Sequence, residues 1–305
     1  MIRRPFTVAC GLVAAAACLH AAQPAAPAFD GGRAYEHIRQ MVAIGPRPAG
    51  SAALQQTRDY IKRQLSAIGV KTEEQPFEPQ TPIGPIKMVN LRATIPGPGR
   101  GRLVIAGHYD TKLFREFSFV GANDGGSSAA FLVELARVLK ARQNAITIEM
   151  LFLDGEEAVR RDWADPDHTY GSRHYVEAAK KAGTLSDVRA LILVDMIGDR
   201  NLVIKRETNS TRWLTDTIWA AAKRLKRPEF VDAATPIEDD HMEFLAAGVD
   251  AVDIIDLEYF SPSGQEMYWH TQQDTLDKVS AGSMEAVGQV LLAALPDIEK
   301  RLMSK

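Results

Sequence analysis

The stretch from Glu149 to Glu157 constrains the fold more than any other part of the sequence. Its apolar residues form a short run that stops at Gly155. An apolar run of this length between helical patterns predicts a central strand of an α/β sheet, buried on both faces. Glu156 and Glu157 follow directly, at the sheet edge where such folds bind ligands. A lone Glu-Glu pair is more often an exposed acidic turn, so the rest of the chain must decide.

Further apolar runs predict more core strands, and amphipathic stretches between them predict helices. This alternation is typical of an α/β fold, here a three-layer α/β/α sandwich with a mostly parallel, twisted central sheet. We expect one catalytic domain over residues 28–305, because no repeat or linker interrupts the pattern. The strands are expected at residues 70–77, 86–95, 103–110, 190–199 and 249–257, and the helices at 31–45, 51–69, after 123–128, 172–182, 210–225 and 283–302.

Residues 1–27 are typical of a signal peptide and leader. Arg3 and Arg4 precede an apolar segment that is too short to span a bilayer, and small residues follow it. We therefore expect an exported protein, periplasmic or secreted, without stable membrane insertion. Lipid attachment at Cys18 is an alternative, although Ala15 stands where such a signal favours a large aliphatic residue.

The two cysteines, Cys10 and Cys18, both fall in this leader. Cleavage beyond Cys18 would leave no disulfide and no thiol chemistry, so any metal must be bound by nitrogen and oxygen. The formal net charge of -3 argues against a nucleic-acid partner, since such proteins usually carry a basic face.

Metal-competent side chains follow several of the predicted strands. Any one of them has a simpler interpretation, because an Asp before a helix is more often an N-cap. Several acids at one sheet edge repel one another, and a divalent cation compensates that repulsion. Carboxylates with imidazole and no thiolate suit a catalytic zinc site. Besides the Glu pair, the candidates are His108, Asp110, Asp124, Asp195 and His270.

Five short motifs, in their order and spacing, resemble the zinc aminopeptidase superfamily, which also contains the glutaminyl-peptide cyclotransferases. The resemblance runs from residue 45 to the C-terminus and implies a phosphorylase/hydrolase-like sandwich. The motifs are His108-Tyr109-Asp110, Asn123-Asp124-Gly125, Asp154-Gly155-Glu156-Glu157, Asp195-Met196-Ile197-Gly198 and Trp269-His270-Thr271.

Other segments look like the cyclotransferase branch, an acyltransferase that converts the N-terminal glutamine of peptides and proteins to pyroglutamate with release of ammonia. They are residues 107–112, 119–122, 170–174 and 237–241, and Trp269, where many aminopeptidases have Tyr.

The cyclotransferase resemblance implies a role for each matching residue. One zinc ion would be bound by Asp124, Glu157 and His270. Glu156 would carry the proton, with Asp195 and Asp239 as a supporting acid network, and Trp269 would orient the substrate. The simpler interpretations are that Asp239 begins a helix and that Trp269 is a core residue.

The alternative function is a secreted dizinc aminopeptidase. His108 and Asp195 would then join Asp124 around a second zinc ion, and Glu156 would activate water for hydrolysis. Residues 125–128 are more similar to the corresponding motif of the peptidases than to that of the cyclotransferases. Trp163 comes one place later than in the better-known cyclotransferases, and Asp253 stands where the animal enzymes lead us to expect His. A non-catalytic binding module is a third possibility, but such domains lose metal ligands that this chain retains.

Overall fold

The computed structural model describes residue 2 and residues 27–257 and 268–304. Cys10, Cys18 and nearly all of the expected signal peptide therefore lie outside the described residues. Within the described part of the chain, no helix combines the length and apolarity that a membrane span requires.

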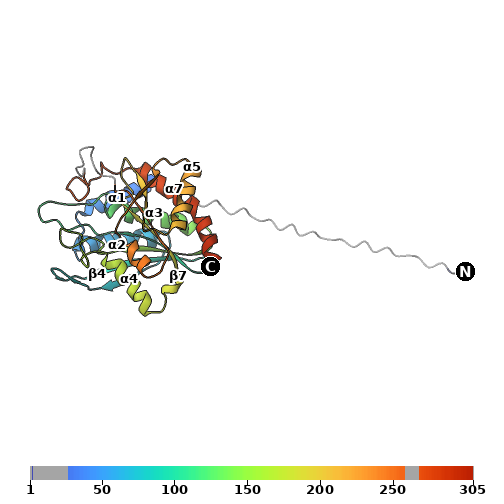
Figure 1. The fold of residues 1–305 in the computed structure, drawn as a ribbon, viewed down its shortest axis with the longest axis horizontal. Helices are drawn as coiled ribbons and strands as arrows, with labels where there is room; N and C mark the ends of the chain where they lie inside the picture. The colour runs from blue at the N-terminus through green and yellow to red at the C-terminus, as the bar shows by residue number, and fades with distance from the viewer. Residues whose placement is uncertain (1, 3–26, 258–267, 305) are drawn as a thin grey trace.

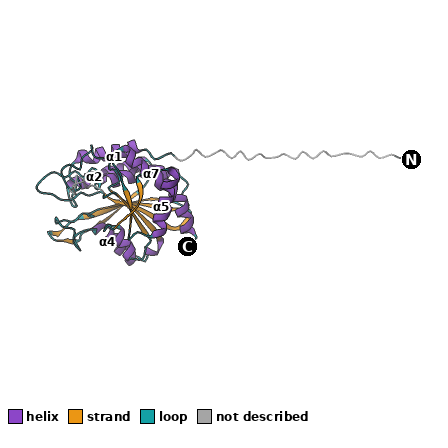
Figure 2. Ribbon diagram, turned by 45° about the horizontal axis from the view of Figure 1, so that its top comes forward, coloured by secondary structure: helices purple, strands orange, loops and turns teal. Residues whose placement is uncertain are grey.

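A six-stranded twisted sheet forms the centre of the molecule, in the order β1-β4-β6-β5-β7-β10 (Figures 1 and 2). The strands β6, β5, β7 and β10 are parallel, whereas β4 and β1 are antiparallel additions at one edge. The predicted mostly parallel sheet is thus confirmed. The strands are β1 (Thr72–Phe77), β4 (Met88–Ile95), β5 (Gly99–His108), β6 (Ile146–Leu153), β7 (Val188–Asp195) and β10 (Ala251–Ile255).

Helices cover both faces of this sheet, which gives the expected three layers (Figure 2). Five helices pack on one face: α1 (Gly31–Ile44), α2 (Ala52–Ala67), α3 (Gly126–Ala141), α5 (Arg212–Leu225) and α7 (Ala281–Met303). The other face carries α4 (Tyr170–Lys181) and α6 (His241–Ala246).

Successive side chains of a strand point to opposite faces of the sheet, so each central strand contributes residues to both hydrophobic clusters. Along β5, Leu103 and Ile105 point into the larger cluster, and Val104 and Ala106 point into the smaller one. Side chains on both faces of a strand must then be apolar, which explains the uninterrupted apolar runs in the sequence.

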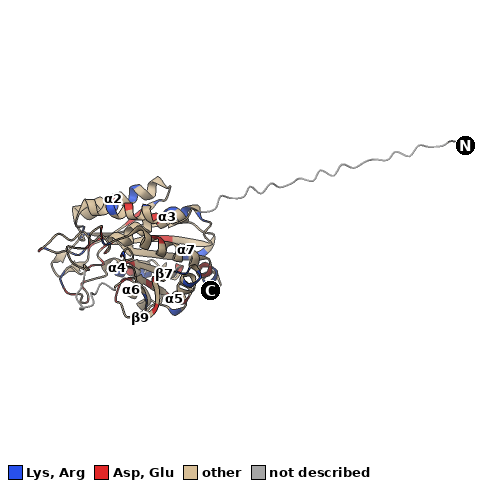
Figure 3. Cartoon of the chain, turned by 90° about the horizontal axis from the view of Figure 1, so that it is seen from above, with Lys and Arg blue, Asp and Glu red and all other residues tan. Residues whose placement is uncertain are grey.

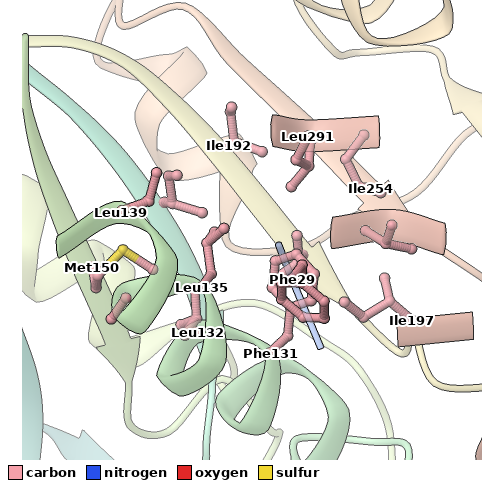
Figure 4. Close-up of a cluster of buried hydrophobic side chains, with 14 of the residues drawn as sticks. Phe29, Phe131, Leu132, Leu135, Leu139, Met150, Ile192, Ile197, Ile254 and Leu291 are labelled. Carbon is pink, nitrogen blue, oxygen red and sulfur yellow. The ribbon is translucent and has the colours of Figure 1, made fainter. Parts of the chain in front are cut away.

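Phe29, two residues before α1, belongs to the larger cluster. Figure 4 shows its ring beside Phe131 of α3, and the ring centroids are 4.9 Å apart. Gly288 of α7 makes room for it, since a Cβ there would lie 2.3 Å from the Phe29 ring. The start of the domain is therefore held in the core.

The predicted helix at Ser51 is confirmed, with Leu54 N donating to the Ser51 side chain at 3.1 Å. The last helix starts earlier than expected because Ser280 caps it in the same way. Helix α6 corresponds to the helix start considered at Asp239, although its N-cap is Asp240. No clear pattern in the sequence predicts the other short elements, which are the hairpin β2 (Gln80–Thr81) and β3 (Gly84–Pro85), the parallel pair β8 (Ile204–Glu207) and β9 (Phe230–Thr235), and the 3-10 turn at Leu185–Asp187. Most of these are too short to establish a hydrophobic period.

Candidate active site

The carboxyl ends of the parallel strands bring the predicted site residues together. His108 is the last residue of β5 and Asp195 the last of β7, while Glu156 and Glu157 follow β6. Because β5 lies between β6 and β7, these ends meet at one edge of the sheet. Gly155 turns the chain there with φ of 71°, and a Cβ would come within 2.5 Å of the Met88 sulfur.

Asp124 reaches the same edge from a loop that precedes α3. The N-cap of α3 is Gly125, so Asp124 is not the capping residue that the simpler interpretation would make it. The backbone amides of Asn123 and Asp124 donate to the Asp274 carboxylate at 2.8 and 3.0 Å. These bonds fix the loop through its backbone and leave the Asp124 side chain directed at the site.

Arg47 holds this loop from the other side. Its side chain is fully buried, and it donates to the carbonyl oxygens of Val120 at 2.7 Å and Gly121 at 3.0 Å. It also donates to Gly45 O and Tyr109 O at 3.3 and 3.4 Å. A guanidinium that satisfies four carbonyls ties together the segments around Asp124.

Asp124, Glu157 and His270 form the first candidate metal group. His270 Nε2 lies 3.2 Å from Asp124 Oδ2 and 3.3 Å from Glu157 Oε1. Neither of these buried oxygens has a hydrogen-bond donor among the described residues. Burial opposes protonation of His270, yet Glu157 and Asp124 raise its pKa to about 10. The same negative potential favours a cation at this point, so the three donors fit a divalent metal ion.

His108, Asp124 and Asp195 form the second candidate group. His108 Nε2 lies 3.0 Å from Asp195 Oδ1 and 3.3 Å from Asp124 Oδ1. In this group one carboxylate oxygen already has hydrogen-bond donors. Asp195 Oδ1 accepts from Ser128 Oγ at 2.9 Å and from Met196 N at 2.8 Å. The Asp195 oxygen that faces His108 is thus occupied by hydrogen bonds, unlike the two unpartnered oxygens of the first group.

Glu156 lies beside the first group without belonging to it. Its side chain is buried, and burial raises the pKa of its carboxyl well above the ordinary value. His108 opposes this rise, whereas the negative charges of Glu157 and Asp239 add to it. A carboxyl in such surroundings is suited to hold and pass on a proton near neutral pH.

A cavity of about 620 Å³ opens over these residues. Asp124, Glu156, Glu157 and His270 line it together with apolar and aromatic side chains, which are Phe114, Trp163, Met196, Ile237, Ile255, Leu257 and Trp269. The Trp269 ring stacks on His270 with centroids 4.3 Å apart. Trp269 also packs against a small apolar cluster, so it is both a wall of the cavity and a partly buried packing residue.

Asp239 lines the same cavity from the loop before α6. Figure 3 shows α6 next to β7 and α4, which explains how this loop reaches the sheet edge. The simpler interpretation also holds in part, because Asp240 is the N-cap residue of α6. The Asp240 carboxylate, however, accepts a hydrogen bond from Ser172 Oγ and makes no capping bond.

Asp253 belongs to the same acidic cluster, although the resemblance implied no role for it. It lies fully buried in the middle of β10, and neither carboxylate oxygen has a hydrogen-bond partner among the described residues. Burial, then the charges of Asp239, Asp195, Glu207 and Asp240, raise its pKa well above the ordinary value. His241 Nδ1 is 3.7 Å away. An acid inside an apolar strand was the signal in the sequence.

Replacing Asp253 with Asn is expected to stabilise the protein at pH 8 but not at pH 4. Near pH 4 the folded protein holds the carboxyl protonated and the unfolded chain is only about half ionised, so the buried acid costs little there. As the pH rises, only the unfolded chain releases the proton, so the buried acid lowers the free energy of unfolding. Each 1 kcal/mol gained corresponds to a melting temperature about 2–4 °C higher. The exposed Asp232→Asn serves as control, and a less stable Asp253→Asn variant at pH 8 would contradict this account.

Residues 90–295 match the profile of peptidase family M28. The chain belongs to this family. It is 30% identical to a glutaminyl-peptide cyclotransferase-like protein of Mus musculus, over 82% of this chain and 72% of that protein.

Two solved structures are similar to the chain over most of its length. A glutaminyl cyclase of an Acidobacteriales bacterium has 39% identity and a TM-score of 0.86, covering 92% of this chain and 98% of that one. A leucine aminopeptidase precursor of Bacteroides thetaiotaomicron has 26% identity and a TM-score of 0.78, covering 88% and 98%. Within family M28, the chain belongs to the glutaminyl cyclase branch.

Proposed function

We propose that this M28 protein is a zinc-dependent glutaminyl-peptide cyclotransferase. The observation that carries the proposal is the contrast between the two candidate metal groups. The Asp124, Glu157 and His270 group leaves two buried oxygens without hydrogen-bond donors, whereas Asp195 is engaged by Ser128 and Met196. This favours one metal ion per site, and the likeness to named glutaminyl cyclases supports the same activity.

Asp124, Glu157 and His270 would hold the metal ion, and one nitrogen with two oxygens suits zinc. When bound, zinc supplies Lewis acidity toward the γ-carbonyl of an N-terminal glutamine. Lys112 contacts the other oxygen of Glu157, since its ammonium lies 3.5 Å from Glu157 Oε2, and it donates to Ala158 O at 3.2 Å.

Glu156 would carry the proton of the reaction. The α-amine nitrogen forms a bond to the γ-carbonyl carbon, and the bond from that carbon to the amide nitrogen breaks. One proton leaves the α-amine for the Glu156 carboxylate and then moves to the departing nitrogen, which leaves as ammonia. The buried position of Glu156 beside the cavity suits both transfers.

The walls of the cavity would hold the substrate for this attack. Trp269 and Trp163 offer flat apolar surfaces and lie on the cavity lining with Asp239. Holding the amine against its own side-chain amide is a positioning effect, and excluding water keeps hydrolysis from competing. The substrates would be N-termini of peptides and proteins that the enzyme meets outside the cytoplasm, in the periplasm or the medium.

A dizinc aminopeptidase is the second candidate, because His108, Asp124 and Asp195 also gather as a metal group and one similar structure is named a leucine aminopeptidase precursor. The peptide Gln-Phe-Ala separates the two. Cyclisation lowers the mass of the intact peptide by about 17 Da, since only ammonia leaves. Free glutamine with Phe-Ala would show hydrolysis and overturn the proposal.

Removal of the metal is expected to abolish activity reversibly. Chelation removes the metal ion from the three donors, and one equivalent of zinc should restore cyclisation because none of Asp124, Glu157 and His270 is a residue that oxidises as cysteine does. Metal content by mass spectrometry, measured beside ammonia release, checks this. Full activity in verified metal-free protein would contradict the assignment.

A further inference from the structure

We propose that Asp165, His168 and Glu238 form a separate binding site for a divalent cation of the zinc class, at the rim of the active-site cavity. One ligand atom from each residue lies within 4.8 Å of the others. The group shares no residue with either metal group described above.

His168 is the residue that marks this point as a ligand site. It is only 3% exposed, and its Nε2 has no hydrogen-bond partner among the described residues. That nitrogen faces Asp165, with Oδ1 3.4 Å away, while Nδ1 lies 3.1 Å from Thr169 Oγ1. Burial lowers the pKa of His168, so the ring is neutral and can act as a metal ligand. A buried imidazole nitrogen without a partner is otherwise costly.

Asp165 and Glu238 provide the negative charge of the proposed cation site. Both are exposed, so a hydrated cation can reach them from solvent. Arg173 Nη2 lies 3.6 Å from Asp165 Oδ1 and partly neutralises this carboxylate in the absence of metal. One imidazole nitrogen with two carboxylate oxygens favours zinc over calcium, which binds six to eight oxygens. Water would complete the coordination, as at other zinc sites with three protein ligands.

The position of the site connects it to the cavity. The His168 ring stacks on Trp163 with centroids 4.2 Å apart, and both Trp163 and Glu238 line the cavity. Asp165 and His168 lie in the loop before α4, and Glu238 lies in the loop before α6. A cation bound to all three would link these two loops and hold Trp163 in the cavity wall, beside the loop that carries Asp239.

Counting bound zinc tests the site directly. The metal-free protein is equilibrated with buffered micromolar zinc, and zinc per chain is measured. We expect two equivalents in the wild type and in His174→Ala, a control whose histidine stacks on Phe77 and belongs to none of the candidate metal groups. His168→Ala is expected to keep one. Glu238→Gln should weaken the second equivalent at least about tenfold, since losing even an outer-shell partner costs about 10–100-fold.

A proteolysis assay gives a second readout that does not depend on activity. Arg161 is exposed in the loop before α4, so trypsin can cleave there. The second equivalent of zinc is expected to slow this cleavage in the wild type and to leave it unchanged in His168→Ala.

Two results would overturn the proposal. One is a wild type that binds a single equivalent. The other is a His168→Ala variant that keeps both, which would assign the second ion to His108, Asp124 and Asp195. The mass of the Gln-Phe-Ala product is read separately, so the cyclotransferase proposal and the rim site can fail independently.

Discussion

Replacing Glu156 with Gln is expected to lower the rate of cyclisation about 100- to 10,000-fold while zinc stays bound. Gln has the size of the protonated acid but cannot accept the α-amine proton. Glu156 does not belong to the group of Asp124, Glu157 and His270, so the metal ligands are unchanged. The buried carboxyl carries a raised pKa, so a neutral amide in its place should be tolerated by the fold.

Glu157→Gln is the matched variant, one residue further along the chain. Glu157 Oε1 faces His270 Nε2 at 3.3 Å, and Oε2 faces the Lys112 ammonium at 3.5 Å. An amide has one oxygen and no charge, so we expect this variant to lose zinc and leave Lys112 buried beside a neutral group. Zinc content and melting temperature of the two variants check the distinction. Equal zinc content would show that the roles of Glu156 and Glu157 are wrongly divided.

Much of this arrangement could be predicted from the sequence because strand ends are simple to locate. An apolar run that stops at Gly155 or at Asp195 marks the carboxyl edge of a parallel sheet, whatever the order of its strands. Side chains placed at several such ends must meet. The structure brings His108, Glu157 and Asp195 to one edge on that principle.

Other parts depend on contacts between segments that are far apart in the chain. Asp274 binds the backbone of Asn123 and Asp124 across 151 and 150 residues, and Arg47 binds Val120 across 73. No local pattern announces such bonds, although the glycines and prolines around Arg47 mark an irregular loop. His168 was likewise not distinguishable from any loop histidine, since its burial beneath Trp163 arises only in three dimensions.

Asp253 lies in an element that the sequence predicts, but its surroundings could not be predicted. The apolar run around it correctly predicted a core strand, β10. Nothing in that run indicated that the Asp253 carboxyl faces His241, or that the charges of Asp239 and Asp240 act on it. Crowded buried acids of this kind cannot all be charged, so their protons are shared within the cluster. The charges of Asp239 and Asp240 also raise the pKa of Glu156, so these acids act on the proposed proton carrier.

Asp239→Ala is expected to reduce ammonia release from a Gln-peptide by at least about 100-fold without removing zinc, the size of effect seen for groups that assist proton transfer. Asp239 lines the cavity, and burial, with Asp195 and Asp240 nearby, raises its pKa well above the ordinary value. A protonated carboxyl here could donate a hydrogen bond to the substrate, which Ala cannot replace.

Asp240→Asn supplies the matched control for Asp239→Ala. Asp240 is the next residue and equally buried, but its carboxylate accepts from Ser172 and is absent from the cavity lining. Burial raises its pKa to about 7, so the amide resembles the form it holds below neutral pH. We expect this variant to keep cyclisation within about tenfold, well short of the loss from an acid–base group. If both variants lose activity alike, the loss reflects the start of α6, and Asp239 has no direct part in the reaction. If Asp239→Ala instead retains full cyclisation and the wild type releases free glutamine, the loop acid is ordinary and the site is that of an aminopeptidase.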